Sequence, residues 1–179
     1  MSFPPGTYRL SGSLVIYDNV QLRGYGKASI LKLLSGANSP LVINANTAAG
    51  NTGIVLSGLY LDGNKAQQTA AFSCIVLVRC TKCEVSDCWL TGALRTGTFP
   101  AISEWGEGVI FLGGSYNRIL RNFVFSNSFD GIKGNSEQFL EIRGNHCWDN
   151  GRCGIQLYCA TSAVGYSFTG STGTKTDGS

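Results

Sequence analysis

The sequence has few charged residues, few prolines and a single histidine. Charged residues make up 14% of the 179 residues, the net charge at pH 7 is +3, and 4 prolines stand against 24 glycines. No cluster of Lys and Arg is present, so nucleic-acid binding has no electrostatic support. No run of about 18 apolar residues is present either, which argues against a membrane-spanning helix. We therefore expect neither a nucleic-acid partner nor insertion into a membrane.

The start of the sequence also lacks the features of a secretory signal peptide. The segment MSFPPGTYRL has neither a charged beginning nor an apolar centre. The sequence therefore does not determine where the protein works, and both a virion and the cell exterior stay open.

Cysteine is abundant, but its pattern does not predict a metal site. The chain has 7 cysteines, an odd number, and one isolated Cys-x-x-Cys formed by Cys80 and Cys83. A zinc site needs four ligands, and no second such pair accompanies this one. A disulfide framework is typical of shorter secreted chains. We expect no metal and no cofactor, and we interpret the cysteines as buried thiols that pack like small apolar side chains.

An internal repeat is the strongest pattern in the sequence. The stretch from Asn117 to Asn135 matches the stretch from Phe139 to Tyr158 after a shift of 23 residues. The matched pairs include Ile119 with Ile142, Asn122 with Asn145, and Gly131 with Gly154. Related copies lie further upstream, and the segments between them differ in length. A conserved pattern with variable insertions is typical of a solenoid, in which each repeat is one turn.

Each turn contains three short segments in which apolar and polar residues alternate, a pattern that predicts strands. Two columns of apolar residues mark equivalent positions in successive turns. The columns are Leu56, Val85, Ile119 and Ile142, and Ile75, Val109, Ile132 and Ile155. We predict an all-β fold, a single-stranded right-handed parallel β-helix of about six turns. It would form one domain over residues 1–179, either a fragment or a minimal β-helix, with a flexible tail at 169–179.

Two stretches resemble a known superfamily. FPPGTYRLSGSLVIYDNVQLRGYGKASILKL (Phe3–Leu33) resembles the opening of pectate-lyase-superfamily proteins of the phage-tailspike and glycoside-hydrolase type. GIVLSGLYLDGN (Gly53–Asn64) resembles the next coil of that superfamily. The resemblance implies a right-handed parallel β-helix that binds or cleaves a polysaccharide.

Apolar side chains occupy outward positions on two of the three predicted faces. The aromatic row on the third strand comprises Tyr60, Trp89, Phe123, Phe125, His146 and Trp148. Outward positions on the first strand include Val76 and Ile110. Such patches usually mark an interface. Three explanations stay open: cover by the insertions Gly63–Ser73 and Gly92–Glu107, a homo-oligomer, with a trimer favoured, or a stacking platform for sugar rings.

Two carboxylates are the main candidates for catalysis. Glu107 and Asp130 each precede a glycine that opens a first strand, so they should lie on adjacent rungs about 5 Å apart. Adjacent carboxylates raise the pKa of one of them, which suits a general acid. Lys133 follows on the same strand and could neutralise a sugar carboxylate. The alternative is that both carboxylates only cap turns.

Six further residues are candidates for substrate binding. They are Trp105, Arg152, Gln156 and Tyr158 around the carboxylates, and His146 and Trp148 in the aromatic row. The segment from Asn127 to Ile132 partly resembles polygalacturonase-like hydrolases, although an additional residue separates its Asn and Asp. We predict a polysaccharide-binding or polysaccharide-degrading module, a hydrolase or lyase if it is an enzyme. The alternative is a non-catalytic structural or oligomeric spike module.

Overall fold

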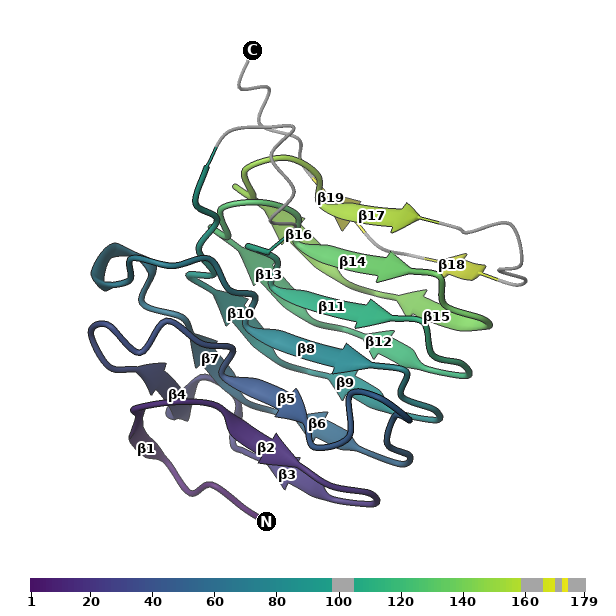
Figure 1. Ribbon diagram of the computed structural model, residues 1–179, viewed down its shortest axis with the longest axis horizontal. Coiled ribbons are helices and arrows are strands. Elements are labelled where there is room, and N and C mark those ends of the chain that lie inside the picture. The colour runs from purple at the N-terminus through teal and green to yellow at the C-terminus, as the bar shows by residue number, and fades with distance from the viewer. Residues whose placement is uncertain (98–104, 159–165, 170–171, 174–179) are drawn as a thin grey trace.

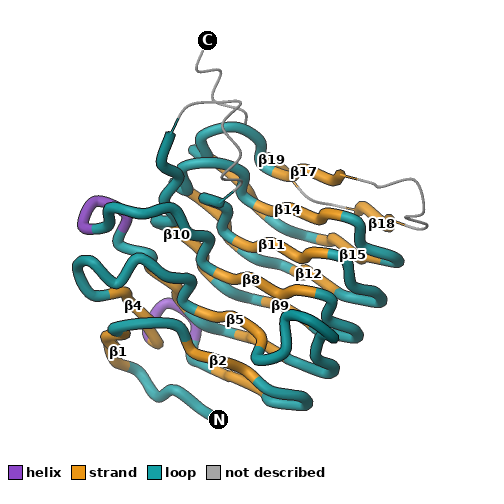
Figure 2. Tube along the Cα trace, viewed as in Figure 1, coloured by secondary structure: helices purple, strands orange, loops and turns teal. Residues whose placement is uncertain are grey.

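The computed structural model describes residues 1–97, 105–158, 166–169 and 172–173. The described chain winds into a right-handed parallel β-helix, in which three parallel sheets form the sides and loops form the corners (Figures 1 and 2). This architecture confirms the predicted fold, including about six turns with three short strands in each. Of the predicted tail, Thr169 ends β18 and Thr172–Gly173 forms β19, and the other residues lie outside the described ones.

The three sheets are numbered here by the order in which each turn visits them. Sheet 1 contains β2 (Leu14–Ile16), β5 (Val42–Asn44), β8 (Ile75–Val78), β11 (Val109–Leu112), β14 (Ile132–Asn135) and β17 (Ile155–Tyr158). Sheet 2 contains β3 (Gln21–Arg23), β6 (Val55–Ser57), β9 (Glu84–Ser86), β12 (Arg118–Leu120), β15 (Leu140–Arg143) and β18 (Tyr166–Thr169). Sheet 3 contains β1 (Gly6–Leu10), β4 (Ser29–Leu33), β7 (Tyr60–Asp62), β10 (Trp89–Thr91), β13 (Phe123–Phe125), β16 (His146–Trp148) and β19 (Thr172–Gly173).

Two 3-10 helices, η1 (Gly26–Ala28) and η2 (Lys65–Gln67), interrupt the loops. In the described part of the chain, no helix is long and apolar enough to cross a membrane.

The register of the sheets stacks equivalent residues on one another. Ile119 of β12 pairs with Val85 of β9 and with Ile142 of β15, as the repeat predicts. Ile132 of β14 pairs in the same way with Ile155 of β17. The inward members Val85, Ile119, Ile142 and Ile132 are fully buried in one continuous apolar core, and Ile155 of the last of these rungs is partly buried against it. Each rung therefore stabilises its neighbours through like contacts about 4.8 Å apart.

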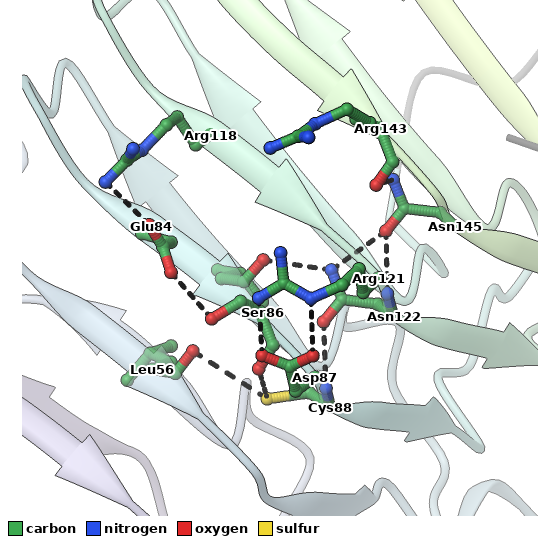
Figure 3. Close-up of polar contacts among 11 residues, drawn as sticks. Leu56, Glu84, Ser86, Asp87, Cys88, Arg118, Arg121, Asn122, Arg143 and Asn145 are labelled. Carbon is green, nitrogen blue, oxygen red and sulfur yellow. Dashed lines mark hydrogen bonds and ion pairs between the residues drawn. The ribbon is translucent and has the colours of Figure 1, made fainter. Parts of the chain in front are cut away.

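A ladder of amides closes the corner between sheets 2 and 3 (Figure 3). The Oδ1 atom of Asn122 accepts the backbone N–H of Cys88 at 3.0 Å, one rung below. The Oδ1 atom of Asn145 accepts the backbone N–H of Asn122 at 2.9 Å. The asparagines that the repeat retains therefore satisfy buried backbone groups at a sharp corner.

The same corner requires left-handed backbone in each turn. The equivalent residue in four successive turns has a positive φ: Gly58 at 63°, Asp87 at 54°, Arg121 at 54° and Gly144 at 67°. This conformation is unfavourable for residues with a Cβ atom. Asp87 and Arg121 are also joined by an exposed ion pair, with Nη2 2.7 Å from Oδ2. Glycine therefore recurs at the corner because the backbone favours it.

The described cysteines are free thiols, and most of them belong to the core. Cys74, Cys80, Cys83, Cys88 and Cys147 are buried, and Cys153 is half-buried. In the described part of the chain, no cluster of three potential metal ligands occurs. Burial raises the pKa of the Cys74 thiol well above its usual range, which keeps that sulfur protonated and unreactive.

The outer faces differ in exposure. On sheet 1 the outward side chains of Val76 and Ile110 are each only 1% exposed, although a single chain is present. The middle of that apolar face is therefore covered without a partner subunit. On sheet 2, Arg118 and Arg143 are exposed, as expected for a solvated face. Sheet 3 carries the aromatic row.

Candidate functional site

The predicted carboxylates lie on adjacent rungs at the corner between sheets 3 and 1. Val109 pairs with Ile132, which aligns the two preceding turns, and the N–H of Gly108 donates to the Asp130 carbonyl at 3.2 Å. The side chains of Glu107 and Asp130 are both fully buried. The predicted neighbours therefore meet, but they meet inside the protein.

Glu107 is held by groups from two other rungs. The hydroxyl of Ser73 donates to its Oε2 atom, and Lys133 Nζ lies 3.6 Å from Oε1. Burial is the main cause that raises the pKa of Glu107 to about 7, whereas Ser73 and Lys133 lower it and Asp130 adds a small increase. The neighbouring carboxylate is the cause predicted from the sequence, but loss of hydration raises the pKa of Glu107 more.

Asp130 is bound by the next rung. Arg152 donates from Nε to Oδ1 at 2.9 Å and from Nη2 to Oδ2 at 2.5 Å, and the N–H of Cys153 donates to Oδ1 at 3.1 Å. Arg152 also donates to the side-chain oxygen of Gln156. Arg152 and Gln156 are both predicted from the sequence to bind substrate. In the structure Arg152 binds Asp130, and Gln156 binds Arg152.

A cation–aromatic stack packs against this corner. The guanidinium carbon of Arg95 lies 4.1 Å from the ring centroid of Phe129, and that of Arg152 lies 3.9 Å from it. Phe129 is only 5% exposed, so the ring is enclosed. Arg95 is not among the predicted residues, because its loop has no equivalent in the other turns.

The remaining predicted residues of this corner are less enclosed. Trp105 is half-buried and directly precedes Gly106, whose N–H donates to Ser73 Oγ at 3.2 Å. Tyr158 is 60% exposed and lies at the far end of β17, away from the corner. The structure brings Glu107, Asp130 and Lys133 together, but as buried side chains.

The aromatic row on sheet 3 forms stacked ladders. The ring of Phe123 lies between Trp89, at 5.1 Å and 9°, and His146, at 5.4 Å and 10°. In the second column Phe125 stacks on Trp148 at 4.6 Å and 5°. Rings stacked in this way cover one another's faces and present mainly their edges outward. His146 and Trp148 therefore belong to a pre-formed aromatic surface.

A hollow opens on the same outer face, toward the N-terminal end. It has a volume of about 580 Å³ and is lined mainly by outward side chains of β1, β4 and β7. Those side chains are Thr7, Arg9, Ile30, Lys32, Tyr60 and Asp62. The sequence does not reveal this hollow, because the insertions between these strands hide their alignment.

Charged and aromatic groups share the hollow. Arg9 pairs in register with Lys32, and Lys32 pairs in register with Asp62. Lys32 Nζ lies 2.8 Å from Asp62 Oδ2. Tyr60 lies edge-on to Phe125 at 6.4 Å and 71°, so it is not stacked in the ladders. The hollow therefore combines a ring outside the stacks with an ion pair and a further cation.

Comparisons with known proteins identify the fold. No protein-family model matches the sequence, and no curated protein matches it. A catalytic domain of a GH87 α-1,3-glucanase in complex with tetrasaccharides matches with a TM-score of 0.76 at 17% identity, over 97% of this chain and 30% of that one. The pre-mature gene product 12 of bacteriophage phi29 matches with a TM-score of 0.78 at 18% identity, over 94% of this chain and 25% of that one.

The A-module of the Azotobacter vinelandii mannuronan C-5 epimerase AlgE4 matches with a TM-score of 0.56 at 17% identity, over 86% of this chain and 50% of that one. At these identities the likeness concerns the fold alone, and it agrees with the parallel β-helix that the superfamily resemblance implies. The chain spans less than a third of the length of the first two structures.

Proposed function

We propose that this β-helix is a polysaccharide-binding module whose binding surface is the outer face of sheet 3. One observation carries the proposal: the hollow around Tyr60 and the aromatic ladders lie on one face, in continuous register from β1 to β16. A sugar chain laid across the rungs would contact both. The glucanase neighbour, which was determined in complex with tetrasaccharides, supports a polysaccharide as the ligand.

Tyr60 is the ring best placed to contact a sugar. It lines the hollow, is half-buried and makes a T-shaped contact with Phe125 instead of a parallel stack. Aromatic side chains bind through a large apolar surface at a small cost in conformational entropy. The ladder of Trp89, Phe123 and His146 extends the surface beyond the hollow.

The test is binding to an array of bacterial and plant polysaccharides, with Tyr60→Ala as the variant. We expect the native chain to bind at least one polysaccharide and Tyr60→Ala to weaken that binding about tenfold, which corresponds to about 1.4 kcal/mol. Tyr17→Ala is the matched control, because Tyr17 is 65% exposed and does not line the hollow. Binding to no polysaccharide, or unchanged binding by Tyr60→Ala, contradicts the proposal.

Polysaccharide cleavage at Glu107, Asp130 and Lys133 is a second candidate function. The pKa of Glu107, raised to about 7, favours it, because a general acid works best with a pKa near the working pH. All three side chains are buried, so cleavage would require the corner to open. Trp105 and Arg152 would then line the opened site.

A matched pair of variants tests this candidate. Burial also raises the pKa of Glu137 to about 7, but Glu137 lies at the opposite corner, between sheets 1 and 2. If Glu107 is the acid, Glu107→Gln abolishes release of reducing sugar or unsaturated product, and Glu137→Gln retains it. Equal activity in both variants contradicts the candidate.

A non-catalytic spike module is the alternative, and the partly exposed aromatic ladders favour it. In this proposal copies of the chain would meet through sheet 3 as a homotrimer. Light scattering would then give three times the chain mass of 19.1 kDa. Trp148→Ser would lower that mass toward the monomer, whereas a monomeric native chain contradicts the alternative.

A further inference from the structure

We propose that the hollow on sheet 3 is a subsite for a negatively charged sugar unit, with Arg9 as its principal anion contact. The inference rests on the proposed function, because it names the class of sugar that the same face would bind.

The charges that line the hollow do not cancel. The outward residues Arg9, Lys32 and Asp62 occupy consecutive rungs of one column, about 4.8 Å apart. Asp62 pairs with Lys32 at 2.8 Å. Arg9 is exposed, and among the described residues it has no acidic partner. One positive charge therefore remains uncompensated in the hollow.

The position of Arg9 beside Lys32 favours binding of an anion. The two cations Arg9 and Lys32 are neighbours on adjacent rungs, and a bound anion would relieve their mutual repulsion. A guanidinium binds a planar carboxylate or a sulfate through two parallel hydrogen bonds. Asp62 holds Lys32 on the side away from Arg9, which leaves the guanidinium free for the ligand.

The other lining groups fit the uncharged part of a sugar. Ile30 and Tyr60 are in register on β4 and β7 and offer apolar surface to a pyranose ring. Thr7 is exposed on β1, one rung below Ile30, and its hydroxyl can bond a sugar hydroxyl. The hollow thus places a cation beside a ring-sized apolar surface, as a uronate or a sulfated sugar requires.

The experiment compares polymers that share a sugar backbone and differ in charge. Polygalacturonate is compared with fully methyl-esterified pectin, which tests the carboxylate, and dextran sulfate is compared with dextran, which tests the sulfate. Binding is measured by biolayer interferometry for the native chain, Arg9→Gln and Arg23→Gln. Arg23 is the matched control, because it is also exposed in the first turn but lies on sheet 2.

We expect the native chain to prefer the charged polymer of at least one pair about tenfold or more, with a preference that declines as salt is added. Arg9→Gln should lower that preference to about twofold or less, and Arg23→Gln should retain it. The preferred pair identifies the carboxylate or the sulfate as the recognised group.

Two outcomes overturn the inference. Equal binding of both members of each pair by the native chain rejects an anion subsite, and a preserved preference in Arg9→Gln rejects Arg9 as the contact. In either case the proposed function stands if Tyr60→Ala still loses binding. Failure of the native chain to bind any of the four polymers rejects the inference alone, and the proposed function is then decided by the wider polysaccharide array.

Discussion

Arg152 places two nitrogens of its side chain against the two carboxylate oxygens of Asp130, at 2.9 Å and 2.5 Å. The Asp130 side chain is fully buried, and that of Arg152 is 30% exposed. The pair therefore links the corner between sheets 3 and 1 to the protein surface. It also neutralises a carboxylate that water cannot reach.

Replacement of Arg152 should be strongly destabilising. Arg152→Ala leaves a buried charge without its cation, and we expect the free energy of unfolding to fall by about 3 to 5 kcal/mol. Adding Asp130→Asn should recover part of that loss, because the uncompensated charge is removed. Urea unfolding of the single and double variants measures both effects.

The exposed pair of Asp87 and Arg121 is the control for this prediction. Its side chains are 49% and 53% exposed, so Arg121→Ala should lower the free energy of unfolding by less than about 1 kcal/mol. Equal losses for Arg152→Ala and Arg121→Ala would contradict the prediction.

Because the rungs stack closely, the loss of stability on replacing a glycine by alanine should depend strongly on where the glycine lies. A Cβ atom on Gly114 would lie 2.0 Å from the carbonyl oxygen of Cys80, a backbone atom one rung away. We expect Gly114→Ala to lower the free energy of unfolding by about 3 kcal/mol or more, because neighbouring rungs must separate. Gly12→Ala is the control, since a Cβ atom there meets nothing within 4 Å. A melting temperature of Gly114→Ala equal to that of Gly12→Ala would count against the tight stacking.

Two buried glutamates predict that stability declines as the pH rises. Burial raises the pKa of Glu107 and of Glu137 from the ordinary 4.5 to about 7. Between these values the unfolded chain has already released both protons, and the folded chain retains them. Each group therefore adds stability below about pH 4.5 and loses that contribution as the pH rises toward 7, by at most about 1.4 kcal/mol per pH unit.

Variants isolate this effect from other titrating groups. The free energy of unfolding is measured in urea from pH 5 to pH 8. Its decline with pH should be less steep in Glu107→Gln and in Glu137→Gln than in the native chain. Stability that declines as steeply with pH in both variants as in the native chain would show that neither glutamate holds its proton in the folded state.

The repeat predicted the fold well because inward positions stack on their own equivalents. Asn122 and Asn145, matched by the shift of 23 residues, are joined by a hydrogen bond, and Glu107 and Asp130 lie on adjacent rungs as expected. Burial of that corner could not be predicted. Part of the packing beside it comes from Arg95, which stacks on the ring of Phe129 and belongs to a loop without counterparts in other turns.

The hollow on sheet 3 could not be predicted either, because insertions of different length separate its residues. Arg9, Lys32 and Asp62 share one column, but the segments between them differ in length, so no fixed spacing reveals their alignment. Only the pairing of β1, β4 and β7 brings these side chains together. Periodicity therefore predicts the scaffold, whereas insertions decide what the scaffold displays.

The coil that occupies residues 117–139 is followed by another of the same length and register. Because a rung contacts mainly the rungs on either side, a tandem duplication of that segment would insert one more layer and leave the other layers unchanged. The length of each outer face is thus a property that evolution, or an engineer, can adjust by duplicating or deleting one coil.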